Sequence, residues 1–392
     1  MNEEAIINIE NELMANVFSK KNIVLIKGNG ALVWDIQGKE YLDFTSSYGV
    51  AALGHCHPNI IAAIDKQAKK LISCHSGFYT PKRAEFLQRI TKIAPKELNK
   101  IFLSNSGAES IECAIKLARK YSERSEIICF MGAYHGKTMG ALSATWDKKY
   151  RKPFEPLVPN FKHVPPNNII KLKQSISDKT AAILVEPIRG EGGVRFYHQG
   201  FLKEVQTLCK NQDILLIFDE VQTSFGRTGK IFAAEHWNII PDIMCLAKPF
   251  AGGLPVGITI AKNEIMSSFK IGEHTSTFSG SPIVCAAGCA AIDILLTDNF
   301  LDNISHLGNY FKSKLETLKS KYSVIKEVRG LGLMLAIELR KDVYEIIQKA
   351  AGKGLLILSA GRNVLRFLPP LIITKKQIDT AIDILDSIIG AE

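Results

Sequence analysis

Between about residues 80 and 290, the chain alternates short, largely apolar runs with segments of helical periodicity. Each run is bounded by polar, Gly or Pro residues, which is typical of a strand buried on both faces of a parallel sheet. The runs cover residues 127–130, 181–185, 214–218, 243–247 and 256–261. The alternation predicts an α/β fold with a mostly parallel central sheet, in which crossover helices cover both faces.

The chain of 392 residues exceeds the usual size of a single hydrophobic core, so a second and smaller unit is expected. Residues 28–44 alternate turns with short strands, as in an antiparallel meander. The last hundred residues contain a long helical segment, two strands and a terminal helix. We therefore expect residues 51–290 to form a large domain, and residues 1–50 and 291–392 to form a smaller α+β domain together.

Composition excludes several classes of function. The net charge is +10, but no basic block with interleaved aromatic residues points to nucleic acid. No run reaches the ~18 apolar residues of a membrane span, and the N-terminus lacks the features of a secretory signal, so we expect a cytoplasmic protein without a membrane segment. Eight cysteines without a CxxC pair suit reduced core thiols. Adjacent residues cannot easily converge on one ion, so His55-Cys56-His57 predicts no metal site.

Two of the apolar runs are followed directly by a charged residue, which suggests a chemical role for that residue. Asp219 follows the run 214–218, and Lys248 follows the run 243–247. Ligands of open α/β sheets bind outside the carboxyl ends of the strands, where both side chains are expected. Pyridoxal phosphate (PLP) would need such a pair, because a lysine holds it as a Schiff base and an acid keeps its pyridine nitrogen protonated. A plain ion pair at a strand edge is the alternative.

A small-residue turn at residues 105–109 (NSGAE) follows another apolar run and opens a helical pattern. Backbone N–H groups at the start of a helix can bind a phosphate, helped by the helix dipole. An ordinary Ser N-cap is the alternative interpretation. The segment around Lys137 is not a nucleotide-binding phosphate loop, because three residues separate Gly132 from Gly136 where that loop needs four.

Seven ordered segments extend this pattern over nearly the whole chain, from Gly28 to roughly Pro370. They are SNSGAES, YHGKT, EPIRGEGG, DEVQTSFGRTG, AKPFAGGLP, STFSGSP and LRFLPPL. The chain resembles class III aminotransferases, which are PLP-dependent transferases of fold type I. The nearest members are acetylornithine, ornithine and carrier-linked aminoadipate-semialdehyde aminotransferases.

The resemblance implies a role for each matching residue of the cofactor site. Lys248 would carry the cofactor and shuttle the proton, and Asp219 would hold the pyridine nitrogen. Gln222 would bind the phenolic oxygen, and Tyr134 would stack on the ring. The other residues implied to contact the cofactor are Ser106, Gly107, Ala108, His135, Glu186 and, across a homodimer interface, Thr277.

The resemblance also implies substrate contacts. Arg366 would grip the α-carboxylate of glutamate or 2-oxoglutarate with its bidentate fork, and Glu191 would pair with it when the donor has no carboxylate there. A permanent structural salt bridge is the alternative. The further implied contacts are Tyr48, Lys137 and Ser276.

Some positions depart from the family pattern. Lys137 replaces the carboxylate-binding arginine of the family, and a lysine cannot reproduce the bidentate grip. Residues 279–282 are Ser-Gly-Ser-Pro where Gly-Gly-Asn-Pro is usual. Tyr48 resembles a tyrosine of ornithine aminotransferases, whereas acetylornithine relatives usually carry an aliphatic residue there. These signals leave the amine donor open.

These patterns together predict a homodimeric, PLP-dependent ω-aminotransferase. It would exchange the terminal amine of an N-blocked ornithine- or lysine-type substrate with 2-oxoglutarate, in arginine or lysine biosynthesis. The positive charge would favour a substrate linked to an acidic carrier protein. Free ornithine and 4-aminobutyrate are the nearest alternative donors. An aminomutase, a decarboxylase or a non-catalytic binding protein on the same fold is a more distant alternative.

Overall fold

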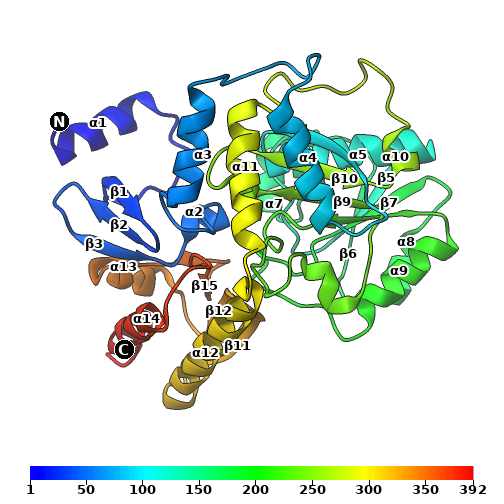
Figure 1. Ribbon diagram of the computed structural model, residues 1–392. Coiled ribbons are helices and arrows are strands. Elements are labelled where there is room, and N and C mark those ends of the chain that lie inside the picture. Colours follow the sequence, from blue (N-terminus) through cyan, green and yellow to red (C-terminus); the bar gives the residue numbers. More distant parts are fainter. Residues whose placement is uncertain (392) are drawn as a thin grey trace.

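The computed structural model describes residues 1–391, and its centre is a seven-stranded sheet of order β4-β10-β9-β8-β7-β5-β6 (Figure 1). Its strands are β4 (Lys100–Ser104), β5 (Glu126–Phe130), β6 (Phe161–Val164), β7 (Thr180–Val185), β8 (Leu215–Asp219), β9 (Ile243–Ala247) and β10 (Gly257–Ala261). Neighbouring strands from β9 to β6 pair in parallel, as predicted.

One strand of this sheet runs against the prediction. β10 is antiparallel to both β9 and β4, although the run at 256–261 was expected to be parallel. Only the one-turn helix η3 (Lys248–Ala251) and a short loop separate β9 from β10. A parallel connection needs roughly a dozen residues or more, so this link is too short for a crossover helix.

Both faces of the sheet are covered, which explains the continuous apolar runs. Alternate side chains of a strand point to opposite faces. Thus Ile127 and Cys129 of β5 join one buried cluster, with residues of α5 (Gly107–Ser122), whereas Ile128 and Phe130 join the other. On that second side lie α8 (Ile169–Ser175), α9 (Phe201–Asn211) and α11 (Pro282–Leu295), which packs beside α3 (Pro58–Ala68) and α4 (Pro81–Ile93).

Residues from both ends of the chain share a second sheet, of order β1-β2-β3-β13. Its members are β1 (Leu25–Asn29), β2 (Leu32–Asp35), β3 (Glu40–Asp43) and β13 (Leu355–Leu356), and β13 pairs in parallel with β3. A third, antiparallel sheet has the order β11-β12-β15-β14. Its members are β11 (Ile325–Leu331), β12 (Met334–Leu339), β14 (Leu358–Ser359) and β15 (Val364–Phe367). The domain boundaries at residues 50 and 290 stay predictions.

The remaining helices are mostly short. Those near the smaller sheets are α1 (Glu3–Leu13), α2 (Ser46–Gly49), α12 (Phe300–Lys321), α13 (Tyr344–Gly352) and α14 (Lys375–Ile389). Those of the large sheet are α6 (Met139–Ala144), α7 (Lys148–Arg151), η1 (Lys152–Phe154), η2 (Ala233–Trp237) and α10 (Asn263–Met266). Within residues 1–391, no single helix is long and apolar enough to cross a membrane, and only the pair α11–α12, bent by 71°, passes that test of length and composition.

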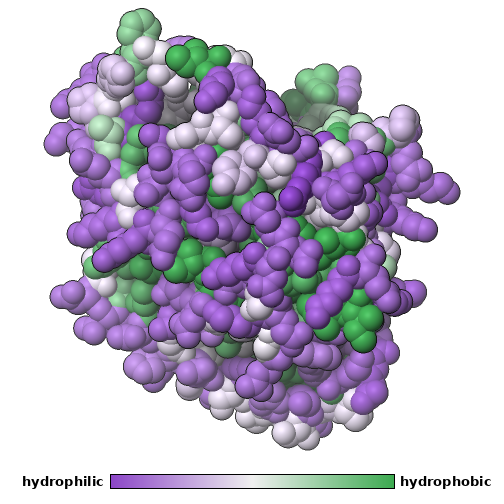
Figure 2. All heavy atoms as spheres, turned by 90° about the vertical axis from the view of Figure 1, so that its right-hand side faces the viewer, coloured by the Kyte–Doolittle hydropathy of each residue, from purple (hydrophilic) through white to green (hydrophobic). Residues whose placement is uncertain are grey.

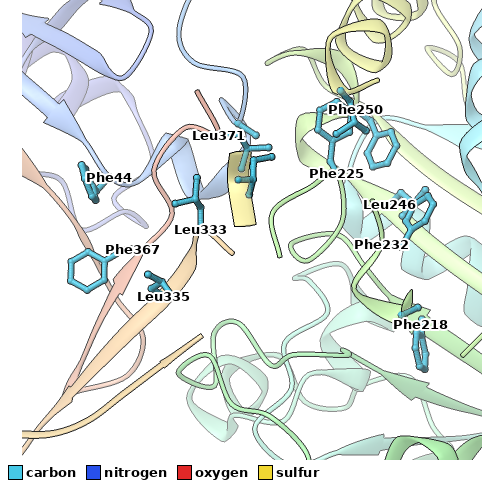
Figure 3. Close-up of a cluster of buried hydrophobic side chains, with 14 of the residues drawn as sticks. Phe44, Phe218, Phe225, Phe232, Leu246, Phe250, Leu333, Leu335, Phe367 and Leu371 are labelled. Atoms are coloured by element: carbon cyan, nitrogen blue, oxygen red, sulfur yellow. The ribbon is translucent and has the colours of Figure 1, made fainter. Parts of the chain in front are cut away.

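One hydrophobic cluster joins the large sheet to the smaller ones (Figure 3). On one side the Phe311 ring lies 5.5 Å from that of Phe44 and 5.4 Å from that of Phe367. On the other side Phe225 and Phe250 meet edge to face at 5.0 Å. Because the cluster is continuous, it fixes the ends of β8 and β9 relative to β15. Outside the core, hydrophilic side chains cover most of the face shown in Figure 2.

Candidate active site

Three elements bring the predicted residues to one edge of the large sheet. β8 ends at Asp219, Lys248 directly follows β9, and α5 begins after β4. They surround a cavity of about 550 Å³. The predicted site residues that line it are Ser106, Gly107, Ala108, Tyr134, His135, Lys137, Glu186, Glu191, Asp219, Gln222 and Lys248.

Lys248 lines this cavity and has an unusual backbone conformation. Its φ angle is +50°, a left-handed value that a non-glycine residue adopts only at an energetic cost. Burial and, after it, the positive charge of Arg366 lower the pKa of Lys248 to about 8, although Glu191 and Asp219 oppose the shift. A lysine with this pKa has a substantial neutral fraction near physiological pH, as a nucleophilic amine requires.

Asp219 is held by two donors. Its Oδ2 atom lies 2.8 Å from Nδ1 of His135, and its Oδ1 atom accepts a hydrogen bond of 3.0 Å from the N–H of Val221. Both side chains are buried, and Nε2 of His135 has no hydrogen-bond partner among the described residues. The two contacts fix the direction in which the carboxylate points.

Glu186 supports the wall of the cavity. Its carboxylate accepts hydrogen bonds from the N–H groups of Tyr134 (2.9 Å) and Gly190 (3.3 Å). Burial raises the pKa of Glu186 to about 7. Glu186 therefore fixes the backbone of Tyr134, the residue predicted to stack on the cofactor ring.

The turn before α5 contains the Ser N-cap, and its phosphate-binding role stays a prediction. Ser106 is the N-cap, since its Oγ atom accepts from the N–H of Glu109 at 3.2 Å, and the Glu109 carboxylate accepts from the N–H of Asn105 at 2.7 Å. The N–H groups of Gly107 and Ala108, in the first turn, have no intrahelical acceptor and can serve an anion. A Cβ atom on Gly107 would lie 2.8 Å from Cγ1 of Val221, so this position needs a glycine.

Arg366 reaches the site from β15 and is fully buried. Its Nη2 atom lies 2.7 Å from Oε1 of Glu191, and its Nη1 atom donates to Oε1 of Gln222 at 3.2 Å. The Arg366 Cζ atom lies 5.7 Å from the centroid of the Tyr48 ring. Tyr48 is exposed and, like Ser46 and Ser47, has a positive φ angle. These contacts join Tyr48 and Arg366 to the cavity, although neither lines it.

Lys137 is exposed at the rim of the cavity. Its Nζ atom lies 5.1 Å from the ring centroid of Tyr150, and Nζ of Lys149 lies 4.6 Å from the same centroid. Tyr150 in turn meets the Tyr134 ring edge to face at 5.8 Å. Sequence reasoning missed Tyr150, because the segment Lys148-Lys149-Tyr150 has no signal beyond that of an exposed short helix.

Ser276 and Thr277 lie differently from the other predicted residues. The Oγ atom of Ser276 accepts a 2.9 Å hydrogen bond from Asn105 of the same chain, and Asn105 lines the cavity. Thr277 is exposed and does not line it. The hydroxyl of Ser276 thus reaches the site of its own chain indirectly, through Asn105, which was expected only as part of the turn at residues 105–109.

The sequence profile of the aminotransferase class-III family matches residues 14–389, so the chain belongs to this family and is a PLP-dependent transaminase. It is 45% identical to the acetylornithine aminotransferase of Caldanaerobacter subterraneus subsp. tengcongensis, over 98% of this chain and 99% of that one. It is 44% identical to the acetylornithine aminotransferase of Methanopyrus kandleri, over 94% of each.

Solved structures give the same result for the fold. The ornithine aminotransferase of Toxoplasma gondii superposes with a TM-score of 0.95 at 32% identity, over 100% of this chain and 96% of that one. The acetylornithine aminotransferase of Elizabethkingia anophelis gives a TM-score of 0.89 at 35% identity, over 100% of both chains. The predicted family, fold class, enzyme class and PLP cofactor are confirmed.

Proposed function

We propose that the protein is an ω-aminotransferase of arginine biosynthesis that exchanges the terminal amine of an N-blocked ornithine-type substrate with 2-oxoglutarate. The relatives named acetylornithine aminotransferase support the ornithine-type substrate and the pathway. The observation that carries the proposal is the Arg366–Glu191 pair beside Lys248. A lysine-type substrate, in a form linked to an acidic carrier, is the variant that the +10 net charge favours.

The Arg366–Glu191 pair suits an enzyme that takes two substrates of different charge. Arg366 is completely buried, whereas the Glu191 side chain is 29% exposed. A buried guanidinium needs a partner, because an unpaired buried charge is costly. Glu191 serves when an amine without a carboxylate at this end is bound, and the α-carboxylate of glutamate or 2-oxoglutarate replaces it in the other half-reaction.

The cavity fits PLP, which supplies an electron sink for the reacting carbon when it is bound. Lys248 supplies the attaching amine and is placed to move the proton. Asp219, held by His135, would keep a proton on the pyridine nitrogen. The first turn of α5 suits the phosphate, and the space that Gly107 leaves beside Val221 keeps that turn close to the strand ends.

An exposed apolar surface supports a homodimer. Phe78, Tyr79 and Phe278 are at least 69% exposed, and large apolar side chains that gather in one exposed patch mark a site of protein–protein contact. The two segments that carry them are tied together, because Arg83 Nη1 donates to the Phe78 carbonyl at 2.7 Å and Arg83 Nε donates to the Gly280 carbonyl at 3.0 Å. A second copy would cover this surface, and Thr277, next to Phe278, would then lie at the interface.

A half-reaction assay tests the proposal. Mixing the PLP-loaded protein with glutamate alone should convert the bound cofactor to pyridoxamine phosphate, and the visible absorption band should disappear in a single turnover. In steady state, kcat/KM for N-acetylornithine should exceed that for free ornithine and for 4-aminobutyrate by about tenfold or more, as expected when a pocket is built around the blocking group. A protein that shows no spectral change with glutamate would instead be an aminomutase or decarboxylase.

Replacing Lys137 with Arg should improve the use of a donor with a distal carboxylate. The guanidinium can bind that carboxylate through two parallel hydrogen bonds, so KM for N-acetylornithine should fall by about three- to tenfold, in line with the ~1 kcal/mol that one additional hydrogen bond typically contributes. Lys149→Arg is the matched control, because Lys149 approaches the same Tyr150 ring but does not line the main cavity. An unchanged KM for Lys137→Arg would mean that residue 137 does not face the substrate.

A further inference from the structure

Glu191 lies on a small hairpin, residues 189–195, that bridges the large sheet and the third sheet. Arg189 and Arg195 close the hairpin with two backbone hydrogen bonds, of 3.0 and 3.1 Å. The N–H of Gly193 donates to the Gly190 carbonyl at 3.1 Å across its tip. Glu191 is therefore part of a closed loop, and any movement of that loop would change its distance to Arg366.

The conformation of this hairpin is strained and is imposed by its surroundings. Val194 has a φ angle of +54°, an outlier for a β-branched residue, and its side chain is fully buried. It belongs to a cluster that includes Met334 of β12 and Val364 of β15. On the other side, a Cβ atom on Gly190 would lie 2.1 Å from Oε1 of Gln222. The hairpin thus fits between the cavity wall and the third sheet without room to relax.

Arg329 on β11 anchors the hairpin to the third sheet. Its Nε atom donates to the Gly193 carbonyl at 2.7 Å, and its Nη1 atom donates to Glu338 at 2.8 Å and to Glu327 at 2.6 Å. Its side chain is only 6% exposed. One buried guanidinium therefore joins the backbone two residues after Glu191 to two carboxylates of the third sheet. A lysine ammonium is a compact point charge and cannot reproduce the fixed planar fork that makes these bonds.

We infer that Arg329 is a positioning residue for the exchange of Glu191 against a substrate carboxylate at Arg366. The inference rests on the proposed function and adds which residue holds Glu191 in place for the exchange. Arg329 does not line the cavity, and its hydrogen bonds among the described residues go to Gly193, Glu327 and Glu338. It fixes the hairpin backbone, so that only the Glu191 side chain has to swing away, and it keeps that carboxylate at a high effective concentration beside Arg366.

The inference predicts opposite changes for the two kinds of substrate. With the hairpin released, Glu191 competes less well for Arg366, and a dicarboxylate binds more easily. The terminal-amine donor reacts more slowly, because the buried Arg366 charge then lacks its partner during that half-reaction. General damage to the site would weaken both, so the opposite signs separate positioning from a merely structural role.

The experiment compares wild type with Arg329→Lys, both as PLP-loaded protein. Calorimetry with glutarate, a non-reacting dicarboxylate, should give a Kd about three- to tenfold lower in the variant, as expected from the lost effective concentration of Glu191. The single-turnover rate with the terminal-amine donor should fall by a similar factor. Adding Arg329→Lys to a Glu191→Gln protein should leave the glutarate Kd unchanged, because the competing carboxylate is already gone.

Two further variants keep the outcome decisive. Lys326→Met is the matched control, since Lys326 pairs with the same Glu338 at 2.7 Å and forms no hydrogen bond to the hairpin among the described residues, and it should behave as wild type. If Arg329→Lys fails to fold, Glu327→Gln serves instead, because Glu327 is 43% exposed and its loss should give the same signs with smaller changes. Equal weakening of both substrates, or an effect that persists without Glu191, would overturn the inference. A wild type that does not react with glutamate would overturn the proposed function itself.

Discussion

Replacing Lys248 with Ala should abolish covalent attachment of PLP and lower kcat by about a thousandfold or more, the scale expected when a covalent nucleophile is lost. Lys248 lines the cavity, and its pKa of about 8 leaves a reactive neutral fraction. Reduction with borohydride followed by mass measurement should add the cofactor mass to wild type and not to the variant. Lys137→Ala is the control, because Lys137 also lines the cavity but is exposed, and it should still carry the cofactor.

The pH dependence of attachment tests the same residue without turnover. Only the neutral amine can attack the aldehyde, and a lowered pKa means that the neutral form gains as pH rises through about 8. The rate at which apoprotein takes up PLP should therefore rise about tenfold per pH unit below 8 and level off above it. A cofactor mass retained by Lys248→Ala, or a rate that still climbs steeply above pH 9, would contradict the assignment.

Replacing Asp219 with Asn should lower kcat by about 10²–10³-fold, comparable to the loss of one preorganised charge that stabilises a transition state. Asn keeps the size of the side chain and can still accept a hydrogen bond from His135, but it has no negative charge to hold a proton on the cofactor ring. The absorption spectrum of the bound cofactor should change as well. Steady-state kinetics and the spectrum of the PLP-loaded variant measure both effects.

Glu220 provides the neighbouring control for Asp219. It is also buried, but its carboxylate accepts hydrogen bonds from the N–H groups of Ala233 and Ala234 and does not line the cavity. Glu220→Gln should therefore lower the melting temperature, whereas the kcat of the folded protein should stay close to that of wild type. If Asp219→Asn turned over as fast as wild type, the catalytic role assigned to Asp219 would be contradicted.

The parts of the structure that depend on local pattern were predictable. Buried runs predicted the strands, and the residues that end two of them, Asp219 and Lys248, meet in one cavity. The antiparallel direction of β10 was missed, because an apolar run carries no sign of direction and only the short link after Lys248 reveals it. The roles inferred from family resemblance, such as those of Gln222 and Thr277, stay predictions.

Long-range contacts were beyond the sequence reasoning. Nothing near Arg329 indicates that it bonds to the Gly193 carbonyl, since the two residues are 136 positions apart. The left-handed backbone conformation of Val194 could not be predicted from the sequence either. A β-branched residue rarely adopts it, and here tertiary packing imposes it. Such contacts and conformations arise from tertiary packing between distant elements, which cannot be read from a single sequence.

The parallel pairing of β3 with β13 has a consequence for synthesis in the cell. The first meander emerges early from the ribosome, yet its last partner strand, Leu355–Leu356, is made only when most of the polypeptide is complete. Until then the free edge of β3 is open to wrong pairing with other nascent chains. We therefore expect this sheet to be completed only late in synthesis, when the C-terminal segment returns to pair with β3.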